Sequence, residues 1–456
     1  MDLRVRAAAT VSILFSAVSA SPGLGAQEAS PQPPSHYRVI DLGTLGGTVS
    51  SGNTINNLGW VMGSSNEAGD TVQLATLWLP GQQIPLGTLG GPSSNVLWPV
   101  KNNSGLISGV TENGSHDPLN ETFSCPVFGF GSGNSCVAFA WKNGRMTQLP
   151  GLGGNNSIGA GANNRGQIVG WAENSIHDPT CVSRRGLVQV LQFEAVIWEM
   201  NEGQWQVRQL PPYPGDPDSA ATAINDAGQA VGISGLCSVA IGGYSAIHAV
   251  LWEDGHPIDL HNLGGHGWNT PAAINNRGVV VGFANQPNDV SNGSLAFLPE
   301  AFLWTREGGI QGLHTLPGDA VSEATDINDA GQVVGVSYGG TDFSNPRAFI
   351  YQNGMMTPLN QLLSKSDQAG FYISSTGGIN DLGEIAAQAN LVSNGVVTTT
   401  LHAVLLVPGG DREDGAVEAQ GVAQELVISE SAQAQMRQHA GMRHFGPIRP
   451  GAARAQ

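Results

Sequence analysis

The stretch Ile224-Asn-Asp-Ala-Gly-Gln-Ala-Val-Gly232 decides the fold, because its pattern, I-N-x-x-G-x-x-V-G, returns seven times along the chain. The copies begin at Ile55, Lys101, Ala162, Ile224, Ile274, Ile327 and Ile379. Successive motif asparagines are 46, 61, 62, 50, 53 and 52 residues apart. A period of this length is typical of repeat proteins in which each unit forms one small supersecondary structure.

Two further motifs keep a constant order around each copy. An apolar-x-Trp segment follows the copy and ends, in chain order, at Trp78, Trp141, Trp198, Trp252, Trp304, Tyr351 and Leu406. A Gly-rich segment precedes each copy. It reads LGTLGG at Leu42 and Leu86, and less regular versions of it begin at Leu149, Leu210, Leu260, Leu313 and Leu359. Three motifs in the same order predict equivalent structural units.

Each unit reads as four short strands, named a to d. Strand a is exemplified by Ala220 to Asn225, b by Gly331 to Gly335, c by Ala301 to Trp304 and d by His256 to Leu260. The Asn-x-x-Gly segment between a and b predicts a hairpin turn, because Asn and Gly both tolerate left-handed backbone. The W-x-x-G segment between c and d predicts a second turn.

Four antiparallel strands per unit are typical of a propeller blade. We therefore predict an all-β fold over residues 37–408, a seven-bladed β-propeller of four-stranded antiparallel blades. Small residues in strand a, such as Ala221 and Ala223, suit the crowded innermost strand, and the Trp of strand c suits the core. The d-type strand Tyr37 to Gly43 comes first and a c-type strand, Leu401 to Val407, comes last. We expect the N-terminal strand to join the last blade in a one-plus-three closure, which removes both free edges.

Several strand c segments resemble one known family. His248-Ala-Val-Leu-Trp252 and His402-Ala-Val-Leu-Leu406 are close to a His-Ala-Phe triplet before an apolar-Trp pair, and Val137-Ala-Phe-Ala-Trp141 and Glu300-Ala-Phe-Leu-Trp304 keep the Ala-Phe. With the DLGTLGG and I-N segments, residues 37–408 resemble the HAF-repeat family of extracellular proteins. The resemblance implies a secreted repeat protein and implies no reaction.

Composition narrows the class of protein. Charged residues make up 12% of the 456 residues, against about 25% in ordinary globular proteins. Glycine, at 63 residues, is about twice as frequent as usual. These values favour an all-β protein with many turns over a coiled coil or a charge-driven disordered chain. The net charge of −17 repels phosphate backbones and disfavours nucleic acid as a partner.

The N-terminus predicts export. Arg4 and Arg6 precede an uncharged, mostly apolar run from Ala7 to Ala20 that is too short to span a bilayer. We interpret residues 1–26 as a secretory signal peptide, cleaved after Ala20 or Ala26, and residues 27–36 as a linker; a buried first helix is the alternative. No later stretch is apolar for long enough to form a transmembrane segment, so we expect a secreted or periplasmic protein, acting as a monomer.

Long b–c loops are the expected place for function, because binding residues collect on loops that a rigid scaffold holds. Those of the second, third and fourth units cover about residues 110–137, 171–194 and 233–247. All four cysteines lie in them, and for an exported chain we predict the disulfides Cys125–Cys136 and Cys181–Cys237. Free thiols or metal ligands are the alternatives.

Two His-Asp-Pro segments stand at equivalent places in adjacent units, His116-Asp117-Pro118 and His177-Asp178-Pro179, each 14 residues after its motif asparagine. A duplicated turn explains them, and the functional alternative is a paired polar site, for example for a metal ion. Exposed aromatics on the long loops would indicate binding, with Phe123, Phe128 and Phe130 as candidates. Acidic d–a loops offer a weak Ca²⁺ hypothesis through Asp216, Asp218, Asp319 and Glu323, in a region that also holds His261, His266 and His314.

The leading hypothesis is a secreted, non-catalytic propeller that binds an extracellular ligand or protein through the b–c and d–a loops. No G-x-S-x-G or H-E-x-x-H motif occurs, so catalysis has no sequence signature here. The alternatives are an extracellular hydrolase or lyase with acidic residues near the central channel, and a structural envelope component. Residues 409–456 lack the repeat and predict a flexible or partly helical tail, whose four arginines after residue 430 could dock on the acidic ring or on an anionic envelope surface.

Overall fold

The computed structural model describes residues 36–121, 125, 130–181, 188–237, 246–287, 289–291, 294–295, 298–409 and 426–443. Five sheets have four antiparallel strands each, and a nine-stranded sheet holds both ends of the repeat array. The all-β prediction is therefore confirmed, with several four-stranded antiparallel sheets of the kind that propellers contain.

The strand bounds follow the repeats. The five four-stranded sheets are β6 (Ser94–Asn95), β7 (Ile107–His116), β8 (Asn134–Lys142) and β9 (Arg145–Gln148); β10 (Gly153–Ala162), β11 (Ile168–His177), β12 (Leu191–Asn201) and β13 (Gln204–Leu210); β14 (Asp218–Ile224), β15 (Ala230–Gly235), β16 (Ala246–Glu253) and β17 (His256–Asp259); β18 (Thr270–Ile274), β19 (Val280–Asn285), β22 (Pro299–Thr305) and β23 (Gly309–Gly312); and β24 (Val321–Ile327), β25 (Val333–Tyr338), β26 (Pro346–Gln352) and β27 (Met355–Pro358). A small hairpin joins β20 (Val290–Ser291) to β21 (Ser294–Leu295).

The nine-stranded sheet contains two antiparallel runs. One run is β2 (Gly46–Ile55), β3 (Val61–Glu67), β4 (Gln73–Leu79) and β5 (Gln82–Pro85), and the other is β28 (Phe371–Ile379), β29 (Ile385–Ser393), β30 (Val396–Pro408) and β1 (Tyr37–Gly43). A single parallel pair, Val49 with Leu401, connects the two runs. β1 pairs with β30 from Tyr37 opposite Pro408 to Gly43 opposite Ala403, so the first strand lies beside the last strand of the array.

The motif asparagine shapes the a–b turn through hydrogen bonds. In the fourth repeat, Asn225 Oδ1 accepts the N–H groups of Ala227 at 3.1 Å and Gln229 at 3.0 Å. Gly228 takes the positive φ, +85°, while Asn225 does not adopt left-handed backbone. The expectation that Asn itself supplies the left-handed residue was wrong, because its side chain is needed to close the turn. In four of the c–d turns both central residues are left-handed, as in Asn143 (φ +51°) and Gly144 (φ +80°), which suits a tight hairpin.

Neighbouring repeats are joined by two series of hydrogen bonds at the a–b turns. Asn225 Nδ2 donates to Asn275 O of the next repeat at 3.0 Å. The same bond links Asn56 to Asn102, Asn163 to Asn225, Asn275 to Asn328, Asn328 to Asn380 and Asn380 back to Asn56. In these six repeats both ends of the amide are used, so the buried motif asparagine closes its own turn and also holds the next repeat. In the second repeat Asn102 Nδ2 donates to Leu106 O of its own turn instead.

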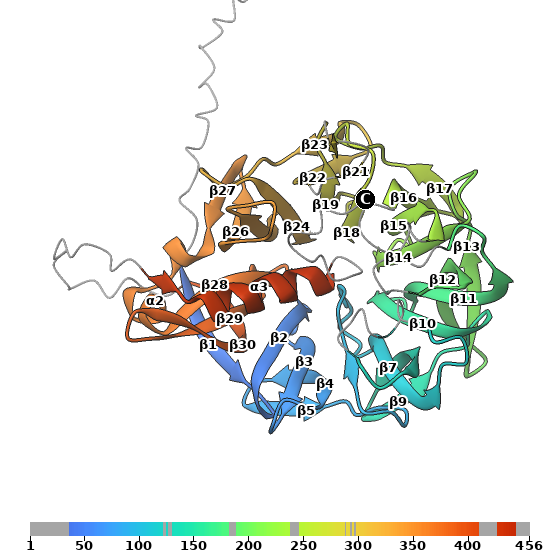
Figure 1. The fold of residues 1–456 in the computed structure, drawn as a ribbon, viewed down its shortest axis with the longest axis horizontal. Coiled ribbons are helices and arrows are strands. Elements are labelled where there is room, and N and C mark those ends of the chain that lie inside the picture. The colour runs from blue at the N-terminus through green and yellow to red at the C-terminus, as the bar shows by residue number, and fades with distance from the viewer. Residues whose placement is uncertain are drawn as a thin grey trace, which may run out of the picture. The chain divides into compact units, whose positions relative to one another are not determined.

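The second series uses the residue after the motif asparagine. Each backbone N–H donates to the side-chain Oδ1 of its counterpart in the next repeat, in the order Asn57, Asn103, Asn164, Asp226, Asn276, Asp329, Asp381 and again Asn57. This series returns to its start, and Figure 1 shows the sheets following one another around a ring in the same order.

The core lies inside and between the sheets. The strand c tryptophans are buried, with Trp198 at 0% and Trp252 at 1% exposure, as the sequence predicts. The indoles of Trp198 and Trp252 donate to the carbonyls of Pro150 and Pro211. The a strands carry small buried residues such as Ala221 and Ala223, and Figure 1 shows β14 and β18 near the centre of the ring.

The described part of the tail packs on the last repeat. β31 (Val427–Ile428) pairs in parallel with Val396 and Val397 of β30. The helix α3 (Glu430–Arg443) buries Ala432 and Met436 against a cluster that includes Val397. Figure 1 shows α3 passing in front of β28 and β29 toward the centre of the ring. Two further helices in the described part of the chain, η2 (Leu359–Leu362) and α2 (Lys365–Gly370), connect β27 to β28.

Candidate functional site

The b–c and d–a connections emerge at one end of each sheet, which we call the long-loop face, and the a–b and c–d turns emerge at the other end, the turn face. Strand b is longer than predicted in the second and third repeats. His116 still pairs with Asn134, and His177 with Leu191. The loops predicted over residues 110–137 and 171–194 therefore start later than the sequence suggested. Glu112 and Glu173, which are polar but fully buried, still belong to the strands.

The two His-Asp-Pro segments end these long strands. In both, the histidine is exposed and the aspartate is buried, with Asp117 at 2% and Asp178 at 6% exposure. Asp117 Oδ1 accepts the N–H of Leu119, and Asp178 Oδ1 accepts that of Thr180 at 2.7 Å. The duplicated-turn interpretation accounts for the aspartates, whereas the rings of His116 and His177 are exposed on the surface.

A buried carboxylate network fixes the second and third repeats to each other. Asn156 Nδ2 lies 3.1 Å from Asp117 Oδ2 and 3.0 Å from Glu173 Oε1. Glu121 Oε1 accepts the N–H groups of Val190 and Leu191 in the next b–c loop. Gln189 Nε2 donates to both Glu121 and Glu173. The network thus ties the start of one long loop to the end of the next.

Protonation is part of this network. Burial, reinforced by the charge of Glu121, raises the pKa of Glu173 to about 7. Burial also raises the pKa of Glu121, against the pull of the two backbone N–H groups that it accepts. A carboxyl group that keeps its proton is uncharged, which relieves the repulsion among crowded carboxylates. Part of this network is therefore protonated near neutral pH.

A second carboxyl pair occupies the equivalent place between the third and fourth repeats. Asp218, at the start of β14, occupies the place that Asn156 has near the start of β10. Asp218 Oδ1 accepts the N–H of Phe193 at 2.7 Å. Its partner is Asp178. Burial and this second carboxyl group raise the pKa of Asp218 to about 9. Asp218 is therefore a neutral acid that donates to Asp178, where Asn156 donates an amide hydrogen to Asp117.

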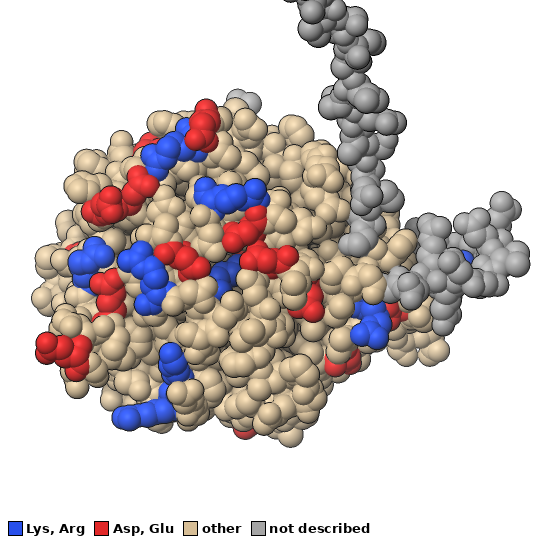
Figure 2. Space-filling view, turned by 180° about the vertical axis from the view of Figure 1, so that it is seen from behind, with Lys and Arg blue, Asp and Glu red and all other residues tan. Residues whose placement is uncertain are grey.

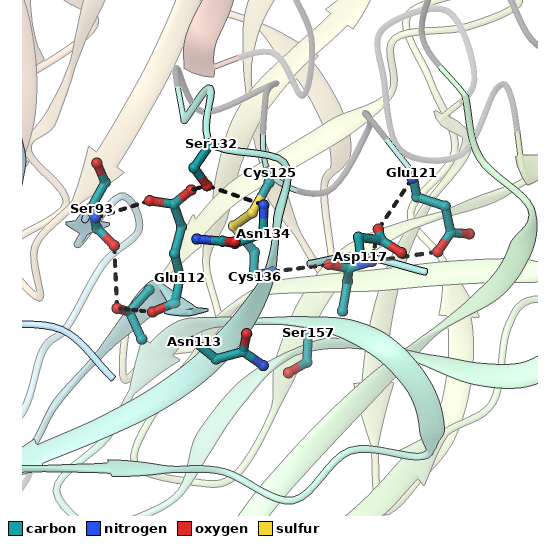
Figure 3. The surroundings of a disulfide bond; sticks show 12 residues. Ser93, Glu112, Asn113, Asp117, Glu121, Cys125, Ser132, Asn134, Cys136 and Ser157 are labelled. Atoms are coloured by element: carbon teal, nitrogen blue, oxygen red, sulfur yellow. Dashed lines mark hydrogen bonds between the residues drawn. A yellow bond between two sulfur atoms is a disulfide. The ribbon is translucent and has the colours of Figure 1, made fainter. Parts of the chain in front are cut away.

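Both predicted disulfides are confirmed. Cys125–Cys136 closes a short loop of the second repeat, and Cys181–Cys237 joins the long loops of the third and fourth repeats. Figure 3 shows the first disulfide beside Glu112, which accepts the Ser93 N–H at 2.9 Å and the Ser132 hydroxyl. The loops that carry the cysteines are thus held by covalent bonds and by buried carboxylates together.

The aromatic candidates do not form an exposed patch. Phe130 is 2% exposed and packs in a cluster with Cys125, Cys136 and Trp171, so its prediction as an exposed binding residue was wrong. Phe123 and Phe128 lie outside the described residues. Among the described residues of these segments, the exposed large apolar side chains are Ile176, at 57%, at the end of β11, and Leu236, at 37%, directly after β15.

The acidic residues of the Ca²⁺ hypothesis are not gathered in one site. Asp216 pairs with His248 at 2.7 Å, Asp319 with Arg347 at 2.7 Å, and Glu323 is buried beside the Tyr338 hydroxyl. The d–a loop histidines are paired as well: His261 with Asp259, His266 with Asp289 and His314 with Glu300. These loop charges are thus engaged with protein partners.

Within the described residues, one group has the spacing of metal ligands, namely Asp178, Cys181 and Cys237. Its two sulfur atoms form the disulfide, so they cannot act as thiolate ligands in this state. Sequence reasoning missed Glu112, Glu121, Glu173, Asn156 and Gln189. The signal for two of them was present, because Glu112 and Glu173 each stand ten residues after a motif asparagine and precede an Asn.

The sheet arrangement is similar to that of several solved structures. The β-propeller domain of the Trilobed protease from Pyrococcus furiosus is 9% identical over 82% of this chain and 96% of that chain, with a TM-score of 0.45. Virginiamycin B lyase from Staphylococcus aureus is 10% identical over 81% of this chain and 99% of that chain, with a TM-score of 0.42. The polysaccharide lyase Uly1 is 9% identical over 76% of this chain and 88% of that chain, with a TM-score of 0.38. Likenesses this distant assign no activity.

No family model matches the chain, and no curated protein matches it. Among the described residues, no helix combines the length and the apolar character needed to cross a membrane.

Proposed function

We propose that residues 37–408 form a seven-bladed β-propeller closed by β1, and that this ring is a secreted, non-catalytic scaffold that binds an extracellular ligand or protein through its long-loop face. The hydrogen-bond series that returns from Asp381 to Asn57 supports a closed ring of seven repeats. The pairing of β1 with β30 supports the one-plus-three closure. The resemblance to HAF-repeat proteins and the two disulfides support export.

The observation that carries the binding proposal is the concentration of anchors in the long loops of the second, third and fourth repeats. Both disulfides and both buried carboxyl networks lie there. A preorganised loop surface binds better because less conformational freedom is lost on binding. We assign His116, Ile176, His177 and Leu236 to this surface because each is exposed beside an anchor.

The hydrolase or lyase alternative predicts carboxylates with shifted pKa values on the same face. Glu173 and Asp218 have such values, yet both side chains are fully buried and hydrogen-bonded to the backbone of neighbouring strands. We therefore assign them to loop anchoring. Figure 2, a view from behind that of Figure 1, shows Lys and Arg interspersed with Asp and Glu, so the net negative charge forms no single acidic patch on that face.

The test compares two sets of exposed side chains on the full chain. Ile176→Ser/His177→Ala/Leu236→Ser alters the long-loop face, and Leu58→Ser/Leu382→Ser, the matched control, alters apolar side chains of the turn face that are 51% and 66% exposed. The probes are insoluble extracellular polysaccharides and isolated peptidoglycan in a sedimentation assay. We expect the long-loop variant alone to lose binding, by about tenfold or more, equivalent to about 1.4 kcal/mol. Equal binding by both variants, or release of soluble products from a polymer by the native protein, would contradict a non-catalytic binding face.

A further inference from the structure

Lys101 departs from the repeat pattern at a defined place. It is one of three lysines, and it stands where five repeats have Ile and one has Ala before the motif asparagine. Its backbone is fixed from both neighbouring repeats. The N–H of Val100 donates to Thr54 Oγ1 at 3.0 Å, and the N–H of Lys101 donates to Ala162 O at 3.0 Å. The start of the side chain is therefore held at the a–b turn of the second repeat.

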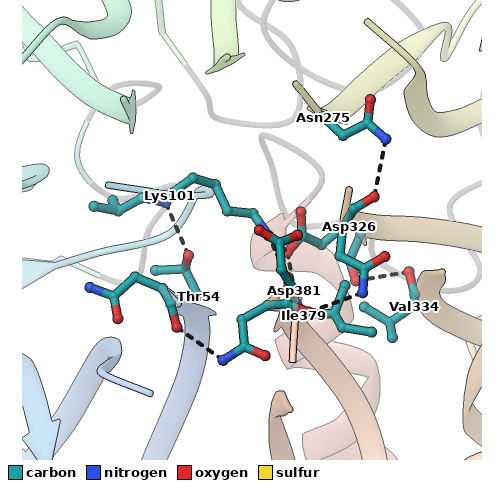
Figure 4. Close-up of polar contacts among 12 residues, drawn as sticks. Thr54, Lys101, Asn275, Asp326, Val334, Ile379 and Asp381 are labelled. Carbon is teal, nitrogen blue, oxygen red and sulfur yellow. Dashed lines mark hydrogen bonds and ion pairs between the residues drawn. The ribbon is translucent and has the colours of Figure 1, made fainter. Parts of the chain in front are cut away.

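The Lys101 side chain does not stay with its neighbours. Nζ donates to Asp326 Oδ2 in the sixth repeat at 2.5 Å and to Ile379 O in the seventh repeat at 2.6 Å. Figure 4 shows the side chain extending from Lys101 to Asp326 and Ile379. The shorter path around the ring from the second to the sixth repeat passes through the sheets β2–β5 and β28–β30. The contact therefore links repeats that are not adjacent.

The far end of this contact is built to receive a cation. Asp326 stands where the fourth and fifth repeats have Ala223 and Ala273, and its side chain is 0% exposed. Its Oδ2 also accepts the N–H of Ile379 at 2.8 Å. Gly378 leaves room for the carboxylate, because a Cβ atom at Gly378 would lie 2.9 Å from Asp326 Oδ2.

The two charges depend on each other. Complete burial raises the pKa of Asp326, and the Lys101 ammonium opposes that rise. A buried carboxylate without its partner is strongly destabilising, whereas an apolar pair in the same place is often neutral. The repeats with Ile and Ala at these positions show which apolar pair the fold accepts.

We infer that Lys101 and Asp326 form a tie between the inner strands of the second and sixth repeats, so that the stability of these two non-adjacent repeats is coupled through one ion pair. This inference rests on the proposed seven-bladed ring, in which the second and sixth repeats are not neighbours. Lys101 keeps 24% of its side chain exposed, so chemistry at its amine can report on the tie.

Lysine acylation measures the tie directly. The full native chain is treated with an N-hydroxysuccinimide acetate, and the modification of each lysine is followed by mass spectrometry. Lys142 and Lys365 are exposed and serve as internal controls. We expect Lys101 to react at least about tenfold more slowly than both, equivalent to about 1.4 kcal/mol, and all three to react alike in denaturant. Equal native rates would overturn the tie.

Variants separate a tie from simple burial. In Asp326→Ala, Lys101 should react nearly as fast as Lys142, whereas unchanged protection would overturn the pairing. Lys101→Ile should lower the midpoint of urea unfolding, and Lys101→Ile/Asp326→Ala should recover most of the loss; additive losses would contradict coupling. If Asp326→Ala does not fold, the acylation rates of the three lysines in the native chain still test the tie. Failure of the long-loop variant to lose ligand, with Lys101 still protected, would refute the proposed function and leave the tie intact.

Discussion

At the scale of the residue, the motif asparagine shows how one side chain satisfies several backbone groups. Asn225 accepts two N–H groups of its own turn and donates to Asn275 O in the next repeat. A buried N–H or C=O without a partner is costly. The sequence revealed that Asn was required at this place, but conformational preference alone suggested the wrong reason.

The Asn225→Asp variant tests this role. Aspartate keeps the acceptor for Ala227 and Gln229 but loses the donor to Asn275 O, so we expect a loss of about 1–3 kcal/mol in the free energy of unfolding. Asn225→Ala should lose more, because the turn also loses its acceptor. The matched control is Asp226→Asn, which places the residue found in four other repeats at the neighbouring position. Urea titration gives the three values, and an equal effect of Asn225→Asp and Asp226→Asn would refute the argument.

The neutral acid at Asp218 predicts a pH dependence. Its folded pKa, about 9, lies above its unfolded value, so the folded state binds the proton more tightly and loses stability as the pH rises from about 4 to about 9. Asp218→Asn supplies the hydrogen without a proton, as Asn156 does. We expect it to raise stability relative to the native chain increasingly with pH, by up to about 4 kcal/mol between pH 5 and 8, because each pH unit contributes about 1.4 kcal/mol.

Thermal midpoints between pH 5 and 9 measure this difference. The reciprocal variant, Asn156→Asp, places a fourth carboxyl group among Asp117, Glu121 and Glu173 and should lose stability as the pH rises. Parallel pH profiles for the native chain and Asp218→Asn would show that no proton is held between Asp178 and Asp218.

At the scale of the element, the long b–c loops owe their shape to anchors outside regular structure. The cysteine pairing followed from loop placement, since each pair lies in one loop or in adjacent loops. The carboxylate anchors could not be derived in the same way. Glu173 and Gln189 are 16 residues apart and meet only because the third repeat folds β11 against β12. Phe130 was misplaced for a similar reason, because the disulfide brings its segment into the core.

The two disulfides should differ in their contribution. Cys181–Cys237 encloses 56 residues and Cys125–Cys136 encloses 11. By loop entropy, removing the first by Cys→Ser pairs should cost about 4 kcal/mol and removing the second about 3 kcal/mol. We also expect limited proteolysis to cut the loop of the fourth repeat first in Cys181→Ser/Cys237→Ser. A larger loss for the Cys125 and Cys136 pair would show that local packing, not loop closure, governs both.

At the scale of the whole molecule, three sequence motifs predicted the strands, their order and the place of the buried tryptophans. The contacts that join distant repeats had no such signal. Lys101 was visible as a departure from Ile, but nothing in the sequence indicated that it reaches Asp326, 225 residues away. The tail helix was also only a composition-based expectation, whereas α3 is fixed by Ala432 and Met436 on the last repeat.

The first strand should determine the stability of the ring. β1 supplies the outer partner of β30, and Tyr37 is 2% exposed. Deleting residues 37–43 would leave β30 with an unpaired edge and uncover apolar core. We expect the thermal midpoint to fall markedly, while deletion of residues 444–456, the matched control, should leave it nearly unchanged. Equal midpoints for the two deletions would contradict closure by β1.

A designed disulfide tests the closed ring most directly. Arg38 lies opposite Val407 in the β1–β30 pair, at the separation that antiparallel partners share and that a disulfide can bridge. No free cysteine is present to compete. Oxidised Arg38→Cys/Val407→Cys should form an intramolecular bond in the monomer and melt at a higher temperature than Arg38→Cys alone. Thiols that stay free under oxidation, or bonds that form only between molecules, would show that the chain does not close on its first strand.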